Sequence, residues 1–103
     1  MLDVLNDIEA WQGAGRDVAL ATLVSVRGSA PRDPGAALAV SSQGELAGSV
    51  SGGCVEAALV DEAGRVLHGG TPRLVEYGIS DSDAQAVGLT CGGRLRIFVE
   101  RLA

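Results

Sequence analysis

Lysine is absent from this chain of 103 residues, and aromatic residues are nearly so, with one Trp, one Tyr and one Phe. With so few aromatic side chains, the hydrophobic core must be built from Val, Leu, Ile and Ala, which suits a tightly layered domain of helices and strands. Without lysine there is no Walker A sequence, and no G-x-G-x-x-G fingerprint lies between a predicted strand and a predicted helix. The common nucleotide-binding motifs are therefore excluded.

Basic residues are few. The chain has eight arginines and 13 acidic residues, which gives a net charge of −5. Generic nucleic-acid binding needs a basic face, and the sequence shows none. No apolar run reaches the roughly 20 residues of a membrane span. The first residues carry Asp3 and Asp7, where a signal peptide would carry basic residues. We therefore expect a cytoplasmic protein.

Cysteine and histidine are also scarce, with Cys54, Cys91 and His68 as the whole set. A disulfide is disfavoured in a reducing cytosol, and no C-x-x-C or other zinc spacing occurs, so we expect no metal site made by the protein alone. His68 lies at the far end of a predicted helix, roughly 20 Å from Cys54 at 1.5 Å per residue. A catalytic Cys–His pair within one chain is therefore disfavoured.

The order of hydrophobic and polar residues predicts two helices, five strands and one segment that is a loop or a short helix. Helical spacing predicts a first helix ending near residues 13–15, and a run that is apolar on both faces predicts a buried strand over 18–26. The further expected elements are a hairpin of 37–40 with 45–48, a helix over 54–68, strands over 74–77 and 95–99, and a loop or short helix over 81–87. We expect an α/β fold (α+β possible): a single compact domain with a mixed β-sheet of about five strands and two main helices.

The sequence SVSGGCVE, residues 49–56, precedes the second predicted helix. Ser51 is a good N-cap residue, which would place Gly52, Gly53 and Cys54 in the first helical turn. Two glycines there lower helix stability by roughly 1 kcal/mol each relative to alanine, but they expose backbone N–H groups to an anion. The helix dipole would also lower the pKa of the Cys54 thiol. On spacing alone, a tight turn with an inert buried cysteine fits equally well.

Two other stretches have similar features. In GLTCGG, residues 88–93, a second cysteine stands beside a Gly-Gly pair, and Cys91 either faces the same site or fills a gap in the packing. The loop RGSAPRDPGA, residues 27–36, places Arg27, Ser29 and Arg32 among prolines and glycines. Arginine suits bidentate contacts to phosphate or carboxylate, although a rigid loop with internally paired arginines is the alternative.

Taken together, GSAPRDPGA, LAGSVSGGCVE and YGI…GLTCGG…IFVE resemble, in this order, the N-terminal domain of the XdhC/CoxI family. The resemblance covers the chain from about Val18 to Glu100. These proteins are accessory factors of molybdenum hydroxylases such as xanthine dehydrogenase and aerobic carbon monoxide dehydrogenase. The resemblance implies a chaperone that binds and protects the molybdenum cofactor (molybdopterin) as cargo. It also implies support for sulfuration of the cofactor and for its insertion into the apo hydroxylase.

The same resemblance implies the cofactor-binding residues and the partners. The residues are Arg27, Ser29, Arg32, Ser51, Gly52, Gly53, Cys54, Glu56, Thr90, Cys91, Gly92 and Gly93, with Cys54 as the candidate contact to the cofactor molybdenum. The implied partners are the apo molybdenum hydroxylase and a cysteine desulfurase. The family's C-terminal Rossmann-like domain does not follow within residues 1–103. We expect either that this domain is encoded separately or that the protein works without it. From the small size we also expect self-association into a homo-oligomer.

Two other functions remain open at this stage. Cys54 could act as a persulfide carrier or nucleophile, which would make the protein a thiol-based sulfur carrier or transferase. The glycines could also serve only to shape turns in a structural interaction module. The chemistry of the motif residues favours the chaperone hypothesis. Helix N-terminal amides and arginines suit the phosphate of the cofactor, and a soft thiolate suits its metal.

Overall fold

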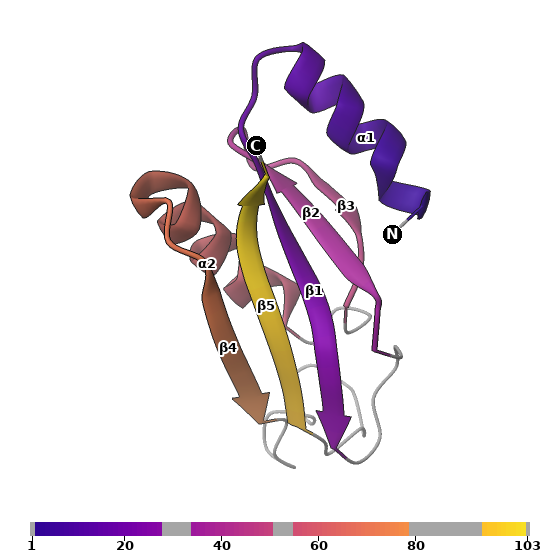
Figure 1. Cartoon of the computed structure of the whole chain (residues 1–103), viewed down its shortest axis with the longest axis vertical. Helices are drawn as coiled ribbons and strands as arrows, with labels where there is room; N and C mark the ends of the chain where they lie inside the picture. The colour runs from indigo at the N-terminus through magenta and orange to yellow at the C-terminus, as the bar shows by residue number, and fades with distance from the viewer. Residues whose placement is uncertain (1, 28–33, 51–54, 79–93, 103) are drawn as a thin grey trace.

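A computed structural model describes residues 2–27, 34–50, 55–78 and 94–102 of the chain. These residues form two helices and five strands (Figure 1). In chain order the elements are α1 (Leu2–Gly13), β1 (Val18–Arg27), β2 (Ala37–Ser41), β3 (Leu46–Gly48), α2 (Glu56–Gly69), β4 (Arg73–Gly78) and β5 (Arg94–Leu102). The predicted helices and strands within these ranges are confirmed. The predicted segment 81–87 lies outside the described residues.

The five strands form one sheet in the order β3-β2-β1-β5-β4, and all four neighbouring pairs are antiparallel. The number of strands is therefore confirmed, but the expected mixed pairing is wrong, and the α+β alternative describes the domain. The long crossover through α2 does join two strands of the same direction, β3 and β4. These strands are the opposite edges of the sheet, so the crossover creates no parallel pair.

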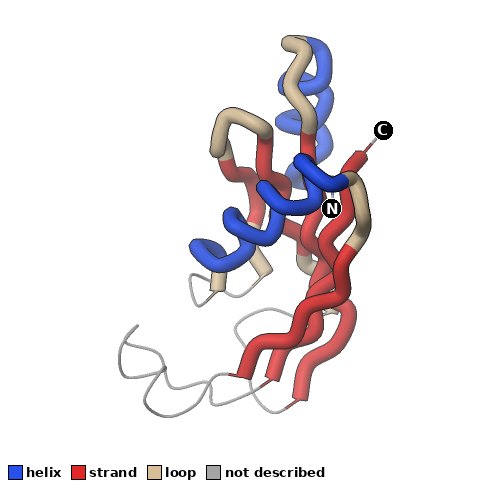
Figure 2. Tube along the Cα trace, turned by 90° about the vertical axis from the view of Figure 1, so that its left-hand side faces the viewer, coloured by secondary structure: helices blue, strands red, loops and turns tan. Residues whose placement is uncertain are grey.

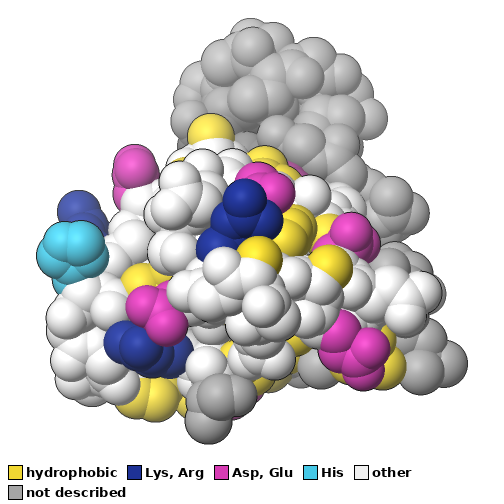
Figure 3. Space-filling view, turned by 90° about the horizontal axis from the view of Figure 1, so that it is seen from above, with side chains coloured by type: hydrophobic (Ala, Val, Ile, Leu, Met, Phe, Trp, Pro, Cys, Tyr) yellow, Lys and Arg dark blue, Asp and Glu magenta, His cyan; other side chains and the backbone are white. Residues whose placement is uncertain are grey.

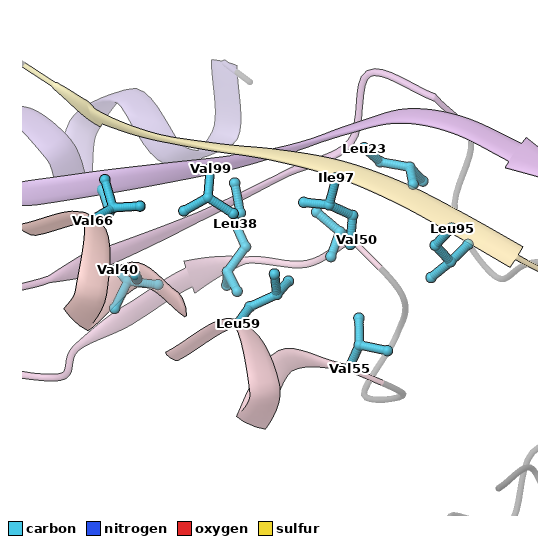
Figure 4. Packing of buried hydrophobic residues seen from close by; sticks show 13 residues of the cluster. Leu23, Leu38, Val40, Val50, Val55, Leu59, Val66, Leu95, Ile97 and Val99 are labelled. Carbon is cyan, nitrogen blue, oxygen red and sulfur yellow. The ribbon is translucent and has the colours of Figure 1, made fainter. Parts of the chain in front are cut away.

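The two helices pack on opposite faces of the sheet, because alternate residues of one strand enter different hydrophobic clusters. On β2, Leu38 and Val40 belong to the cluster under α2, whereas Ala37 and Ala39 belong to the cluster under α1. Figure 2 shows α2 running along the twisted sheet. The larger cluster gathers Leu59 and Val66 of α2 against side chains of β1, β2 and β5 (Figure 4).

Helix α1 covers only part of its face. It contacts β2, β3 and β1, and its buried residues Val4, Ile8 and Trp11 lie against the start of β1. On the same face, no described helix covers β4 or the Arg94 end of β5. Arginine and glutamate side chains share that part of the sheet with Leu74, which is 52% exposed, and the alternation of exposed and buried residues on β5 agrees with the one solvated side predicted for the last strand.

Helix α2 begins two residues later than its predicted start at Cys54. Its first residue is Glu56 and its N-cap is Val55, which makes no side-chain capping bond. The expectation that Ser51 caps this helix and that Gly52, Gly53 and Cys54 form its first turn is therefore wrong. At the other end, Gly70 adopts a left-handed conformation with φ of 75° and donates its N–H to the carbonyl of Val66, as expected for a glycine stop.

Candidate functional site

Two of the twelve predicted cofactor-binding residues fall within the described part of the chain. Arg27 is the last residue of β1, and Glu56 is the first residue of α2. The other ten lie outside the described residues: Ser29, Arg32, Ser51, Gly52, Gly53, Cys54, Thr90, Cys91, Gly92 and Gly93. The structure therefore bears on the candidate site through the residues that flank the three sequence motifs.

The flanking residues of two motifs meet at one end of the sheet. Arg27, which precedes residues 28–33, is the register partner of Arg94, which follows residues 79–93. Gly78, which precedes that second stretch, is the register partner of Arg94 on its other side. The ends of β1 and β4 and the start of β5 lie together at the lower end of the sheet in Figure 1. Residues 27, 78 and 94 are thus adjacent, although they are far apart in the sequence.

The third motif, residues 51–54, is flanked by Val50 and Val55. Both side chains are buried in the cluster under α2, and Leu95 of β5 belongs to the same cluster. Figure 4 shows Val50 and Val55 together with Leu95 and Ile97. Since Leu95 is next to Arg94 in the chain, one buried cluster connects the flanks of residues 51–54 with the end of the sheet where Arg27 and Arg94 pair.

The carboxylate of Glu56 holds the backbone that leads into residues 51–54. Its Oε2 accepts one hydrogen bond from the Oγ of Ser49 at 2.8 Å and another from the backbone N–H of Val50 at 3.0 Å. A negative charge in the first turn also interacts favourably with the positive end of the helix dipole. The described contacts of Glu56 therefore position the chain before Ser51, and a contact with a cofactor stays a prediction.

An arginine cluster, which no sequence motif indicated as a unit, lies at this end of the sheet. Arg27, Arg94 and Arg96 line a cavity of about 600 Å³ together with Ser25, Val26 and Glu76. Glu76 accepts a hydrogen bond from Nη1 of Arg94 at 2.7 Å and forms an ion pair with Nε of Arg96 at 3.7 Å. The available signal was the alternation of Arg94 and Arg96 on the wet side of the last strand. Their proximity to Arg27 follows only from the strand register.

The opposite end of the domain carries no comparable group of one charge among the described residues. There Arg16 pairs with Glu45 at 3.2 Å, and Arg101 pairs with Asp17 at 3.0 Å. Viewed from above, basic and acidic side chains stand next to each other (Figure 3). The charges of this end are thus locally balanced.

Titration and metal binding add little to the described site. Burial, and then the nearby carboxylate of Glu62, raise the pKa of Tyr77 above its usual value of 10.0. Tyr77 packs under α2, on the other face of the sheet from the arginine cluster. Among the described residues, no group of three or more His, Cys, Asp or Glu side chains could hold a metal ion. Neither described helix is long and apolar enough to cross a membrane.

Comparison with known proteins gives consistent matches. Residues 11–78 match the XdhC and CoxI family. The chain is 39% identical over 89 residues to the molybdenum cofactor insertion chaperone PaoD of Escherichia coli K12, which covers 86% of this chain and 28% of PaoD. It is 32% identical over 104 residues to a probable xanthine dehydrogenase subunit of Bacillus subtilis 168, which covers 99% of this chain and 30% of that protein.

A solved structure shares the fold. The crystal structure of a xanthine dehydrogenase from Bacillus halodurans superposes with a TM-score of 0.79 at 28% sequence identity, over 95% of this chain and 30% of that one. The chain thus spans less than a third of the length of each of these relatives.

Proposed function

Since the chain belongs to the XdhC and CoxI family, we propose that it is an accessory protein that binds the molybdenum cofactor as cargo. It protects the cofactor and helps to insert it into a hydroxylase of the xanthine dehydrogenase or carbon monoxide dehydrogenase type. The similarity to PaoD, a molybdenum cofactor insertion chaperone, at 39% identity over 86% of this chain supports this proposal. The protein acts as a maturation factor, and the chemistry of hydroxylation belongs to the enzyme that it serves.

The observation that carries the proposal is that strand pairing and one buried cluster connect the flanks of the three motifs. Arg27 and Arg94 are register partners, and Val50 and Val55 are buried in the same cluster as Leu95. A cofactor that carries a phosphate at one end and a metal–dithiolene group at the other needs groups of different chemistry within one region. Arginine suits the phosphate, and a thiolate such as that of Cys54 suits the soft metal.

The partners follow from this role. The apo hydroxylase receives the cofactor, and a cysteine desulfurase supplies the sulfur that replaces an oxo ligand of the molybdenum before insertion. A separate homologue with a Rossmann-like domain, and a second copy of this chain, are further partners in the proposal. All of these steps would take place in the cytoplasm.

The sulfur-carrier alternative needs a Cys54 thiol with a lowered pKa. Cys54 lies outside the described residues, directly before Val55, the N-cap of α2, so this alternative stays a prediction. His68 is exposed at the other end of α2.

The test is to purify the protein in the presence of molybdenum cofactor and to measure bound molybdenum by mass spectrometry and bound pterin by fluorescence after oxidation. We expect the wild type to retain both, Cys54→Ser and Gly53→Ala to lose most of both, and the control His68→Ala to retain both. A wild type that retains neither, or a Cys54→Ser protein that retains as much as the wild type, contradicts the proposal.

A further inference from the structure

The arginine cluster has three positive side chains on one face of the sheet. Arg27 and Arg94 are directly opposite each other on β1 and β5. Arg96 follows two positions later on β5, and therefore projects from the same face. Leu95 and Ile97, which alternate with them, are buried under α2. The cluster thus lies on the side of the sheet away from α2.

This arrangement opposes stability when nothing else is bound. Like charges placed directly opposite on neighbouring strands destabilise a sheet. The chain has eight arginines against 13 acidic residues. In a chain with more acidic than basic residues, three neighbouring arginines are unexpected. Elsewhere in the described chain, Arg16 and Arg101 each have a carboxylate of their own within ion-pair distance, and Arg65 and Arg73 share that of Glu62. No described residue forms an ion pair with Arg27.

Glu76 is the one carboxylate among the described residues that lines the cavity with these arginines. It lies opposite Arg96 in the register and bridges the Arg94 and Arg96 guanidinium groups through its two carboxylate oxygens. Each guanidinium has five N–H donors, and Glu76 occupies only a small part of this capacity. The bridge orients two guanidinium groups side by side, and among the described lining residues three arginines against one glutamate leave an excess of two positive charges.

We propose that Arg27, Arg94 and Arg96 form a binding site for a phosphate group, with the Ser25 hydroxyl as a further donor. The excess of two charges matches a phosphate monoester dianion, and planar guanidinium forks match phosphate oxygens in pairs. The cavity of about 600 Å³ provides the space. The phosphate comes from the terminal monoester of the pterin cofactor or from free phosphate. Only the first source depends on the proposed function.

The test uses the whole chain, labelled with ¹⁵N-arginine and titrated with inorganic phosphate at low salt. The Nε–Hε resonances of Arg27, Arg94 and Arg96 should shift and saturate together, while those of Arg65 and Arg101 stay in place. In Arg94→Gln/Arg96→Gln, we expect the Kd for phosphate to rise by about tenfold or more, since charge-assisted hydrogen bonds are lost.

Two single variants make the test specific. Arg65→Gln removes a charge from a side chain that is as exposed as that of Arg94, 64% in both cases, and should leave the Kd within about twofold. Glu76→Gln keeps an acceptor for the arginines but removes the competing negative charge, so binding should tighten by a few-fold. Shifts that do not saturate, or an equal loss in Arg65→Gln, would overturn the proposal. So would weaker binding in Glu76→Gln.

Measuring retention of the molybdenum cofactor in the same variants separates the two proposals. If Arg94→Gln/Arg96→Gln loses both phosphate binding and cofactor retention, the cofactor monoester is the ligand. If phosphate binds at the cluster but the wild type retains no cofactor, free phosphate is the source, and the proposed function fails while this inference holds. If the wild type retains cofactor but phosphate shifts none of the three arginines, this inference fails and the proposed function stands.

Discussion

The carboxylate of Glu56 accepts a hydrogen bond at 3.0 Å from the backbone N–H of Val50, a residue six positions earlier whose side chain is completely buried. The same oxygen accepts a hydrogen bond from the hydroxyl of Ser49. These two hydrogen bonds connect Ser49 and Val50, which precede residues 51–54, with Glu56 in the first turn of α2. A side chain predicted to contact a cofactor has, in the structure, a defined role in holding the backbone around that motif.

Replacing Glu56 with alanine should therefore destabilise the domain. The Val50 N–H and the Ser49 hydroxyl lose their common acceptor, and a buried donor without a partner costs about 1–3 kcal/mol. Urea denaturation followed by far-UV circular dichroism measures this loss. Glu9→Ala, an exposed change in α1, is the control and should shift stability by less than about 0.5 kcal/mol. Equal stability of the two variants would rule out the structural tie.

Gly48 cannot accept a side chain. Its φ is +84°, and a Cβ would collide with the carbonyl oxygen of Ala37 and approach a methyl group of Val4 to 2.6 Å. We expect Gly48→Ala to cost at least about 2 kcal/mol of the free energy of unfolding, from backbone strain and steric overlap.

A second glycine supplies the control for this substitution. Gly64 is exposed within α2, and a Cβ atom added there would meet nothing within 4 Å, so Gly64→Ala should stabilise the domain by about 0.5–1 kcal/mol. Thermal unfolding of both variants against the wild type measures the two effects. Shifts of the same sign would contradict the packing described around Gly48.

Alkaline pH should weaken the fold through Tyr77. Its pKa is raised in the folded state by burial and by Glu62, so the folded protein holds this proton where the unfolded chain begins to lose it. The contribution is fully present below about pH 10 and is lost as the pH rises through the higher folded value. Stability measured between pH 9 and 11 should fall more steeply for the wild type than for Tyr77→Phe. Parallel slopes would contradict this assignment.

Leu59 is the central contact between α2 and the sheet. It is completely buried, and it lies in one cluster with Leu38 and Ile97. Leu59→Ala should cost about 2–5 kcal/mol, because the transfer free energy is lost and a cavity remains. Leu46→Ala on β3, where the side chain is 48% exposed, is the size-matched control and should change stability by less than about 1 kcal/mol. Chemical denaturation distinguishes the two.

Local patterns predicted most of the fold but not the contacts between distant elements. The alternation in residues 94–102 identified β5 and its solvated side, and Gly70 marked the end of α2. The start of α2 was misplaced because Ser51 is a good cap residue by type, whereas the helix begins at Glu56 with Val55 as its N-cap. The mixed sheet was wrong because a long crossover does not reveal which strands become neighbours.

The candidate site was predictable only in part for the same reason. Short motifs indicate chemistry, and in this chain they drew attention to Arg27 and Glu56. The proximity of Arg27 to Arg94 depends on a strand pairing that joins residues 67 positions apart. No local pattern in the sequence contains that register. Prediction of such clusters therefore needs the topology first.

The position of β5 has a consequence for the order in which the domain can fold. This strand lies between β1 and β4, and its register joins Val18 to Leu102 and Arg73 to Val99. Until residues 94–102 have emerged from the ribosome, β4 lacks the neighbour it has in the sheet, and the α2 face of β1 is incomplete. Until then, β1, β2, β3 and α2 can form only part of the sheet and of the cluster under α2. Completion of the sheet then requires closing long loops, a step that is slow and exposed to aggregation.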